Sequence, residues 1–452
     1  MSMKQIQPNN LFSKDILDYK VDTRKLGRVN YVNLDNAATT PPFLEVQQTV
    51  QDFMISYGSV HRGSGTKSQV STKNYEDSRE VIKKFLGATN DDYVLFSGNT
   101  TGAMNMAAYF FSFLEGKVMV SDLEHSSSWL PWIKQEGVKS LGSKQVSIEE
   151  LAELNEDVQQ AGVKQVITYQ SNSKGHFDLE NIEELLQKND VKVLVLTASS
   201  NLTGYLPPIR EIGNLARKYG AYFLVDGCQY IQHHKLNMKE MGIDFLVASG
   251  HKIYAPYGEG FLIGSKDVLD AFLPYEIGGG NLPYITRDGT FLRYKNQLAH
   301  DPGTPNSLGA VAIATAIQVI QKLGIENIER YERKLADRLF SYLNDNKNIE
   351  LYLNDPNYST VFPFNVKGLL SSHVARLLND DYGIGVRSGS FCVYQVVRKM
   401  NKIEDEESII NMVKQGDTNT VPAVVRASIG LGNTEGDIER LITALDEITK
   451  DL

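Results

Sequence analysis

Three observations in the amino-acid sequence predict an α/β fold, with a mostly parallel seven-stranded sheet, helices on both faces and a smaller α+β unit after it. Seven short runs rich in β-branched residues alternate with helical patterns between residues 92 and 265. Polar or glycine residues directly follow most of these runs. After about residue 304 the pattern changes to a long helical stretch and then to short strand-like pieces. Strands that alternate with helices pair in parallel, because the chain must cross back before it runs in the same direction again.

The predicted strands of the large sheet span residues 93–96, 117–120, 165–169, 191–197, 222–225, 245–248 and 260–263. Their composition suits strands that are buried on both faces. A long helical stretch is predicted over 308–323 and on through 338, and strand-like pieces are predicted at 359–366 and 424–428. We therefore expect a large domain at 31–303 and a small C-terminal domain at 304–452. The N-terminal segment 1–30 is expected to pack on the small domain or on a partner subunit.

Composition limits the class of protein. The 452 residues, 42% of them hydrophobic and 22% charged, suit a globular protein with two lobes. A net charge of -9, from 46 basic and 55 acidic side chains, argues against a dedicated nucleic-acid binder and favours a small-molecule substrate. Two cysteines, Cys228 and Cys392, are too few for a disulfide scaffold. The sequence shows neither a signal-peptide pattern nor an apolar run of about 20 residues, so we expect a cytoplasmic protein without a membrane partner.

Polar segments follow five of the predicted strands, at residues 97–101, 122–125, 199–201, 226–229 and 249–252. In open parallel sheets, ligands bind outside the carboxyl ends of the strands, where such segments meet. The sequence therefore predicts one shared ligand site at this edge of the sheet.

Lys252 and Asp226 predict the chemistry of that site. Lys252 follows a buried strand, where desolvation can lower the pKa of its amine and free the lone pair to attack an aldehyde. Asp226 ends the preceding strand, where its carboxylate could keep a bound pyridine nitrogen protonated. The alternatives are a lysine in a surface loop and an aspartate that caps the next helix. Together the two residues favour a pyridoxal 5'-phosphate (PLP) site.

The turn at residues 97–101 leads into a predicted helix, so its hydroxyls and backbone N–H groups could hold a phosphate at the helix N-terminus. Ser249 and His251 arrive from another strand end and would complete this phosphate site. Such turns more often only cap helices, and that alternative stays open here.

His125 and Arg426 are further candidates. The His125 imidazole could lie over a pyridine ring or transfer protons near neutral pH, and the alternative is an ordinary hydrogen-bonded loop histidine. Arg426 is a single guanidinium in a strand-like run, which suits bidentate binding of a substrate carboxylate. A simple salt bridge is its alternative.

The chain resembles the class V aminotransferase superfamily of fold-type I PLP enzymes, and within it group II cysteine desulfurases and selenocysteine lyases. The resemblance extends over almost the whole chain. It is carried by residues 31–40, 60–63, 100–101, 124–125, 200–204, 226–229, 249–252, 303–306, 386–389, 426–428 and 433–434.

The resemblance implies a role for each matching residue. Lys252 would hold PLP as a Schiff base, Gln229 would donate to the ring oxygen, and His125 would stack on the ring. A threonine at position 304 would reach the phosphate of the other subunit, which implies a homodimer with shared active sites. The implied cofactor-binding residues are Thr100, Thr101, Asp226, Gln229, Ser249, His251, Lys252 and Thr304, and the implied substrate-binding residues are Asn201, Arg387 and Arg426. The resemblance implies no metal.

Cys392 lies where the desulfurases carry their nucleophilic cysteine. The resemblance implies that its thiolate would attack the sulfur of a small amino acid, giving an enzyme persulfide and alanine, with the sulfur passed later to an acceptor. This chain has Ser390 and Phe391 where group II enzymes have two histidines. It also has a longer stretch before position 426, in which an amphipathic helix is predicted at 403–414 and ends at Gly416.

Three functions remain open from the sequence. The first is a cysteine desulfurase-like lyase in which Cys392 is catalytic together with Lys252 and His125. The second is a class V aminotransferase or epimerase in which Cys392 is only a small buried thiol. The third is a non-catalytic protein of the same fold that acts as a binding partner. Cys228 is interpreted as a packing residue.

Overall fold

The computed structural model describes residues 6–141, 151–172, 175–352, 359–416, 421, 423–450 and 452. Its largest element is a seven-stranded sheet in the order β4-β10-β9-β8-β7-β5-β6. The strands are β4 (Asp92–Ser97), β5 (Lys117–Ser121), β6 (Val166–Tyr169), β7 (Val191–Thr197), β8 (Tyr222–Asp226), β9 (Phe245–Ser249) and β10 (Gly260–Ser265). Only β10 pairs antiparallel with its neighbours. All seven predicted strands are confirmed, and so is the predicted fold class.

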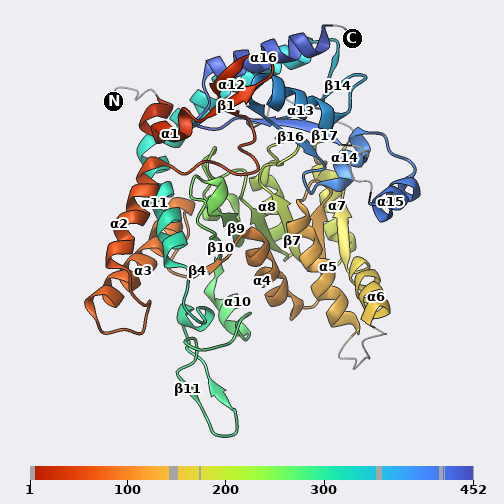
Figure 1. Cartoon of the computed structure of the whole chain (residues 1–452). Helices are drawn as coiled ribbons and strands as arrows, with labels where there is room; N and C mark the ends of the chain where they lie inside the picture. Colours follow the sequence, from red (N-terminus) through yellow and green to blue (C-terminus); the bar gives the residue numbers. More distant parts are fainter. Residues whose placement is uncertain are drawn as a thin grey trace.

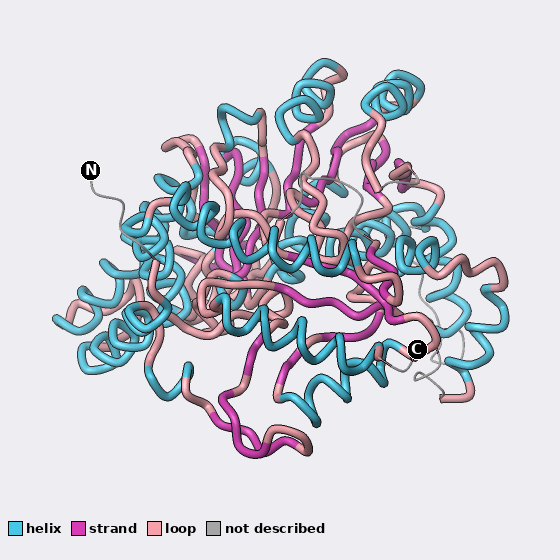
Figure 2. The backbone as a smooth tube through the Cα atoms, turned by 90° about the horizontal axis from the view of Figure 1, so that it is seen from above, coloured by secondary structure: helices cyan, strands magenta, loops and turns pink. Residues whose placement is uncertain are grey.

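Alternate residues of the central strands face two separate apolar clusters, as the two-residue period of a strand requires. On one face, Val193, Val195 and Leu224 pack with helices α4 (Thr100–Ser112) and α5 (Ser126–Leu141). On the other, Leu194 and Leu196 pack with α2 (Leu44–Ser56), α7 (Leu179–Lys188), α8 (Ile209–Lys218) and α11 (Ser307–Leu323). Figure 2 shows helices lying on either side of the strands. The strands are continuous apolar runs because both faces are covered.

The long helical stretch predicted over 308–338 is two helices. Gly324 ends α11 with a φ of +81°, which a residue with a β-carbon rarely adopts, and α12 (Ile325–Asp345) starts directly after it. The two helix axes differ in direction by 80°. α11 packs against α2 and α3 (Thr66–Leu86) beside the large sheet. No single helix in the described ranges is long and apolar enough to span a membrane. The bent pair of α11 and α12 reaches that length and hydropathy only when the two helices are taken together.

A second, antiparallel sheet has the order β13-β14-β17-β16 and lies above the large sheet in Figure 1. Its strands are β13 (Ile349–Leu351), β14 (Val361–Val366), β16 (Arg387–Gly389) and β17 (Val424–Ser428). It forms one apolar cluster with α12, α13 (Ser371–Tyr382) and α16 (Glu435–Thr449). The hairpin of β1 (Lys20–Thr23) and β2 (Gly27–Asn30) lies against α13, where Arg24 binds Asp381 at 2.5 Å.

The chain after Cys392 forms two short helices, α14 (Tyr394–Met400) and α15 (Glu406–Lys414). The predicted helix at 403–414 therefore starts three residues too early, because the side chain of Asp405 caps the N-terminus by accepting from the N–H of Ser408. Gly416 has a φ of +81°, as expected for the residue that ends it. Helix α14 was not predicted. It packs Val396 and Val397 into the core cluster of the large sheet, and its Lys399 binds the Asp122 carboxylate at 2.5 Å.

Candidate active site

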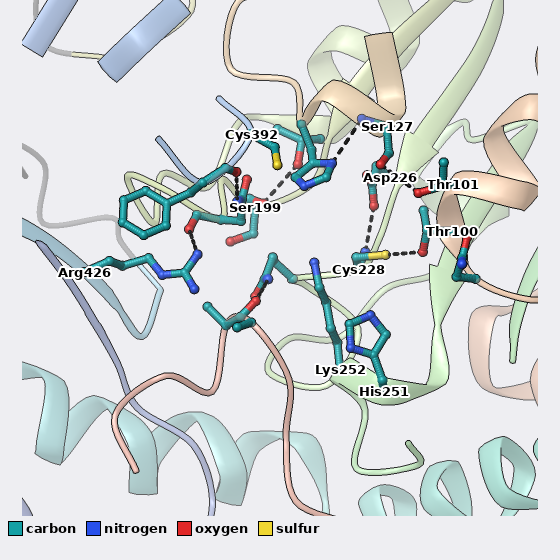
Figure 3. Close-up of a pocket in the computed structure, with 18 of the residues that line it drawn as sticks. Thr100, Thr101, Ser127, Ser199, Asp226, Cys228, His251, Lys252, Cys392 and Arg426 are labelled. Carbon is teal, nitrogen blue, oxygen red and sulfur yellow. Dashed lines mark hydrogen bonds between the residues drawn. The ribbon is translucent and has the colours of Figure 1, made fainter. Parts of the chain in front are cut away.

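A cavity of about 290 Å³ opens at the carboxyl ends of the parallel strands and is also lined by Arg387 and Arg426 of the small sheet. Figure 3 shows its side chains converging from both sheets. It is lined by Ala37, Ala38, Asn99, Thr100, Thr101, His125, Ser127, Thr197, Ser199, Asn201, Asp226, Cys228, Gln229, His251, Lys252, Arg387, Phe391, Cys392 and Arg426. The structure thus brings together all the predicted site residues except Ser249 and Thr304.

Ser249 and Thr304 lie outside this cavity. Ser249 is the buried last residue of β9 and leads into the short 3-10 helix that carries Lys252. Thr304 is exposed and lines a separate cavity of about 310 Å³ together with Gly98 and Gly102. Both cavities are lined by residues of the turn at the start of α4, but Thr304 lines only the second one.

Asp226 is held in one orientation at the end of β8. Its Oδ2 accepts from the Ser128 hydroxyl at 2.6 Å, and its Oδ1 accepts from the N–H of Cys228 at 3.0 Å. The residue is buried and borders the cavity. The two hydrogen bonds and the exclusion of water hold the Asp226 carboxylate in one orientation. A protonated ring nitrogen in the cavity could bind to it there.

His125 and His251 flank Lys252 and are neutral at physiological pH. Burial, reinforced by the charge of Lys252, lowers the pKa of each imidazole to about 4. Nδ1 of His125 accepts from the N–H of Ser127 at 3.1 Å, so the ring proton is assigned to Nε2. A neutral imidazole can stack on an aromatic cofactor without placing a second positive charge beside the lysine.

The N-terminus of α4 forms one wall of the cavity. Asn99 caps the helix by accepting from the N–H of Gly102. Thr101 Oγ1 lies 2.8 Å from Ser127 Oγ, and Thr100 Oγ1 lies 2.7 Å from the sulfur of Cys228. Hydroxyls beside free helical N–H groups fit a phosphate dianion.

Two polar groups in the same wall have fixed partners. Gln229 Nε2 donates to the carbonyl of Ala37 at 2.6 Å, which leaves its second amide hydrogen available to a ligand. Burial raises the pKa of the Cys228 thiol well above its usual range, so this thiol stays protonated.

One side of the cavity holds two arginines that share one carboxylate. Arg426 Nη2 donates to Asp35 Oδ1 at 2.9 Å, and Arg387 Nε donates to Asp35 Oδ2 at 3.1 Å. Arg426 is only 2% exposed, and its Nη1 donates to the carbonyl of Asn201 at 2.9 Å. Because one aspartate faces two arginines, this part of the cavity keeps a net positive charge. Such a charge favours the binding of an amino-acid carboxylate.

Cys392 enters the cavity from a loop with an unusual backbone. Phe391 and Cys392 have φ values of +53° and +59°. The carbonyl of Cys392 accepts from both the N–H and the hydroxyl of Ser126, at 2.8 and 2.9 Å. The thiol therefore sits in the same cavity as Lys252 because two separated segments are hydrogen-bonded there.

Sequence reasoning assigned no role to Asp35, Ser128 or Phe391. Asp35 belongs to the segment 31–40 that carries the family resemblance, so its position in that segment could have identified it as a site residue. Ser128 and Phe391 have no motif of their own, since each acts only through a contact that folding creates.

Comparisons with known proteins identify the family of the chain. A "probable cysteine desulfurase" of Halalkalibacterium halodurans is 29% identical over 96% of this chain and 95% of the relative, and one of Pyrococcus abyssi is 31% identical over 93% and 95%. Among solved structures, the apo cysteine desulfurase of Thermococcus onnurineus NA1 superposes with a TM-score of 0.78 at 28% identity, covering 93% of this chain and 95% of that one. The Aminotransferase class-V model matches residues 32–144 and 146–441. The chain therefore belongs to the class V aminotransferase family.

Proposed function

We propose that this protein is a PLP-dependent enzyme that takes sulfur or selenium from cysteine or selenocysteine, leaving alanine and a Cys392-bound sulfur or selenium atom. The observation that carries the proposal is that the Cys392 thiol shares one cavity with Lys252, Asp226 and Arg426. The relatives and solved structures named cysteine desulfurase support it.

The residues of the cavity fit PLP, the cofactor of this family. PLP, when bound, supplies an electron sink for negative charge at the substrate α-carbon. Lys252 would hold it covalently, Asp226 would face its ring nitrogen, and the N-terminus of α4 would bind its phosphate. His125, being neutral, would stack on the ring, and Thr304 would reach the phosphate in a partner subunit.

The remaining residues would carry the reaction. Arg426, Arg387 and Asn201 orient the substrate carboxylate, and the amine of Lys252 moves the proton at the α-carbon. The Cys392 thiolate forms a sulfur–sulfur bond while the carbon–sulfur bond of the substrate breaks. The electron pair of the broken bond stays on the β-carbon, which takes up a proton and becomes the methyl group of alanine. Cysteine plus the Cys392 thiol gives alanine plus a Cys392 persulfide, without an external oxidant.

A transamination or epimerisation without a persulfide is the second candidate. It is favoured by the surroundings of Cys392, whose thiol has no hydrogen-bond partner among the described residues. Ser390 and Phe391, which precede it, carry no group that titrates near neutral pH.

The proposal includes the assembly and the cell compartment. We expect a cytoplasmic homodimer with shared active sites, and a separate acceptor that takes the sulfur from Cys392. The division into domains at residue 304 is kept as part of this proposal.

The deciding experiment measures alanine and sulfide production from cysteine, cysteine sulfinate and selenocysteine by the PLP-loaded protein. Cys392→Ala is expected to lose alanine production from cysteine. Cys228→Ala, which removes the other thiol of the cavity, is expected to keep it. If Cys392→Ala turns over its substrate as fast as the wild type, the persulfide mechanism is wrong and the second candidate replaces it.

A spectroscopic experiment separates an enzyme from a non-catalytic partner protein. The purified wild type is expected to be yellow with PLP, and borohydride is expected to trap the cofactor on Lys252, as a peptide mass would show. Lys252→Ala provides the control without trapping. A colourless wild type that takes up no added PLP would support the non-catalytic protein.

A further inference from the structure

Three buried residues, Asn201, Phe391 and Arg426, form a closed set of contacts that we call the clasp. Arg426 Nη1 donates to the carbonyl of Asn201 at 2.9 Å, and Asn201 Nδ2 donates to the carbonyl of Phe391 at 2.9 Å. The set closes because Arg426 Cζ lies 4.5 Å from the centroid of the Phe391 ring. The clasp therefore connects the arginine at the substrate end of the cavity to the residue directly before Cys392.

The backbone around Cys392 depends on such contacts. Phe391 and Cys392 both have positive φ values, which are unfavourable for residues with a β-carbon and persist only when the surroundings hold them. The clasp holds this loop at Phe391, and Ser126 holds it at the carbonyl of Cys392. The direction of the thiol is thus set by contacts on both sides of the strained pair.

The guanidinium of Arg426 has donors left for a ligand, because Nη1 and Nη2 each carry a second hydrogen besides the one bonded to Asn201 or Asp35. Its Nε is buried and has no hydrogen-bond partner within the described part of the chain. The Phe391 ring covers one face of the guanidinium, which favours the approach of a carboxylate in the guanidinium plane. Figure 3 shows Arg426, Cys392 and Lys252 around the same cavity.

We propose that Phe391 is a positioning residue that couples the carboxylate-binding guanidinium of Arg426 to the thiol of Cys392. A guanidinium held in place by substrate keeps the Phe391 ring, and with it the strained loop, in the orientation that directs the thiol into the cavity. The roles of Arg426 and Cys392 in this coupling rest on the function proposed above. Phe391 departs from the group II pattern that the chain resembles, in which histidines precede the cysteine.

The test is a double-mutant cycle read by the alkylation of Cys392 in the PLP-loaded protein. The rate of iodoacetamide addition is measured from the mass of the Cys392 peptide in the wild type, Phe391→Leu, Arg426→Lys and the double variant. Arg426→Lys keeps the positive charge but loses the planar group. Each single substitution is expected to raise the rate about threefold to tenfold, and the double variant is expected to match Phe391→Leu alone, as groups in one contact network do. If the rate increase of the double variant equals the product of the two single increases, the two residues act independently and the proposed coupling is wrong.

Matched variants separate positioning from general loosening of the fold. Phe391→Tyr keeps the ring and is expected to restore the wild-type rate. Phe53→Leu removes a buried ring from α2, away from the cavity, and is expected to leave the rate unchanged. A rate that rises as much in Phe53→Leu would overturn the proposal. If Phe391→Leu does not fold, Phe391→Met replaces it in the cycle.

Alkylation needs no turnover, so the two proposals fail separately. A wild type that forms no alanine from cysteine but shows the coupled rates contradicts only the proposed function. A wild type that forms alanine while the two substitutions act independently contradicts only the role of Phe391.

Discussion

Asp35 binds two arginines of the site through its two carboxylate oxygens. Arg426 is almost completely buried, whereas Arg387 is half exposed, so Asp35 matters most as the counter-charge of Arg426. A buried charge that loses its partner costs more than the pair contributes, because the remaining charge stays desolvated.

We expect Asp35→Asn to lower the free energy of unfolding by about 2 to 3 kcal/mol, near the lower end for a broken buried ion pair because Asp35 keeps some contact with water. Urea unfolding monitored by circular dichroism measures it. The control is Asp77→Asn, which breaks the exposed pair between Lys73 and Asp77 and is expected to change stability by less than about 0.5 kcal/mol. Equal effects of the two substitutions would contradict the importance of Asp35.

Because the pKa of His125 is lowered to about 4, we expect the stability of the cofactor-free protein to depend on pH. Between pH 6.5 and 4 the unfolded chain binds a proton at this position and the folded chain does not, so stability falls as the pH is lowered. Relative to His125→Asn, the wild type is expected to lose up to about 1.4 kcal/mol per pH unit in this window.

The measurement is the free energy of unfolding of both proteins at several pH values from 7 to 4.5. Other buried groups, such as Glu124 with its pKa raised to about 8 by burial, are present in both proteins and cancel in the difference. A difference that stays constant over this range would show that His125 is not desolvated.

At the scale of elements, the strands of the large sheet could be predicted because their signal is local. Seven consecutive residues of β7 are all buried, and four of them, at 193–196, appear in the sequence as an apolar run. The break between α11 and α12 was missed because helical periodicity continues on both sides of Gly324. Helix α14 was missed because it has only seven residues and its position depends on contacts with another part of the chain.

Lys399 is the main polar contact that holds α14 to the large sheet. Its amine binds Asp122 at 2.5 Å and Gln170 at 2.8 Å, at the carboxyl end of β5. Asp122 is fully buried and also accepts from the N–H and hydroxyl of Ser171.

We expect Lys399→Ala to speed amide hydrogen exchange in residues 394–414 by about tenfold, since the loss of a charged hydrogen bond to a buried group is worth about 1.5 kcal/mol. Hydrogen-exchange mass spectrometry measures it. Lys402→Ala removes a neighbouring exposed lysine and is expected to leave the exchange unchanged. Slow exchange in Lys399→Ala would show that apolar contacts alone hold the helix.

At the scale of the whole molecule, a hairpin with exposed apolar side chains, which we call the arm, protrudes from the rest of the fold. The strands β11 (Tyr284–Ile285) and β12 (Phe291–Leu292) form a hairpin that protrudes in Figure 1. The side chains of Tyr284, Ile285 and Leu292 are more than half exposed. The same segment leads to Thr304, which does not line the cavity of its own chain, and both facts support the proposed homodimer.

We expect the double substitution Ile285→Asp and Leu292→Asp to convert the dimer to monomers, because it places charges in an apolar contact. Light scattering after size-exclusion chromatography measures the mass. Leu130→Asp changes an equally exposed leucine on α5 and is expected to leave the dimer intact. A wild type that elutes as a monomer, or an arm variant that stays dimeric, would contradict the proposed interface.

The sequence by itself determined the large sheet and which residues lie at its carboxyl edge. Strand periodicity is a local property, and a residue that directly follows a parallel strand must lie at the carboxyl edge. For this reason Lys252, Asp226 and His125 could be assigned to one site before the structure was known, and the structure places all three around one cavity.

Only the tertiary structure decided which side chains meet across the two sheets. Asp35 and Arg426 are 391 positions apart, and Asn201 and Phe391 are 190 apart. No local pattern encodes such pairs, since they depend on how one sheet packs over the other and on two residues held at positive φ. The arginine-lined end of the cavity, including the clasp beside Cys392, therefore became visible only in the folded chain.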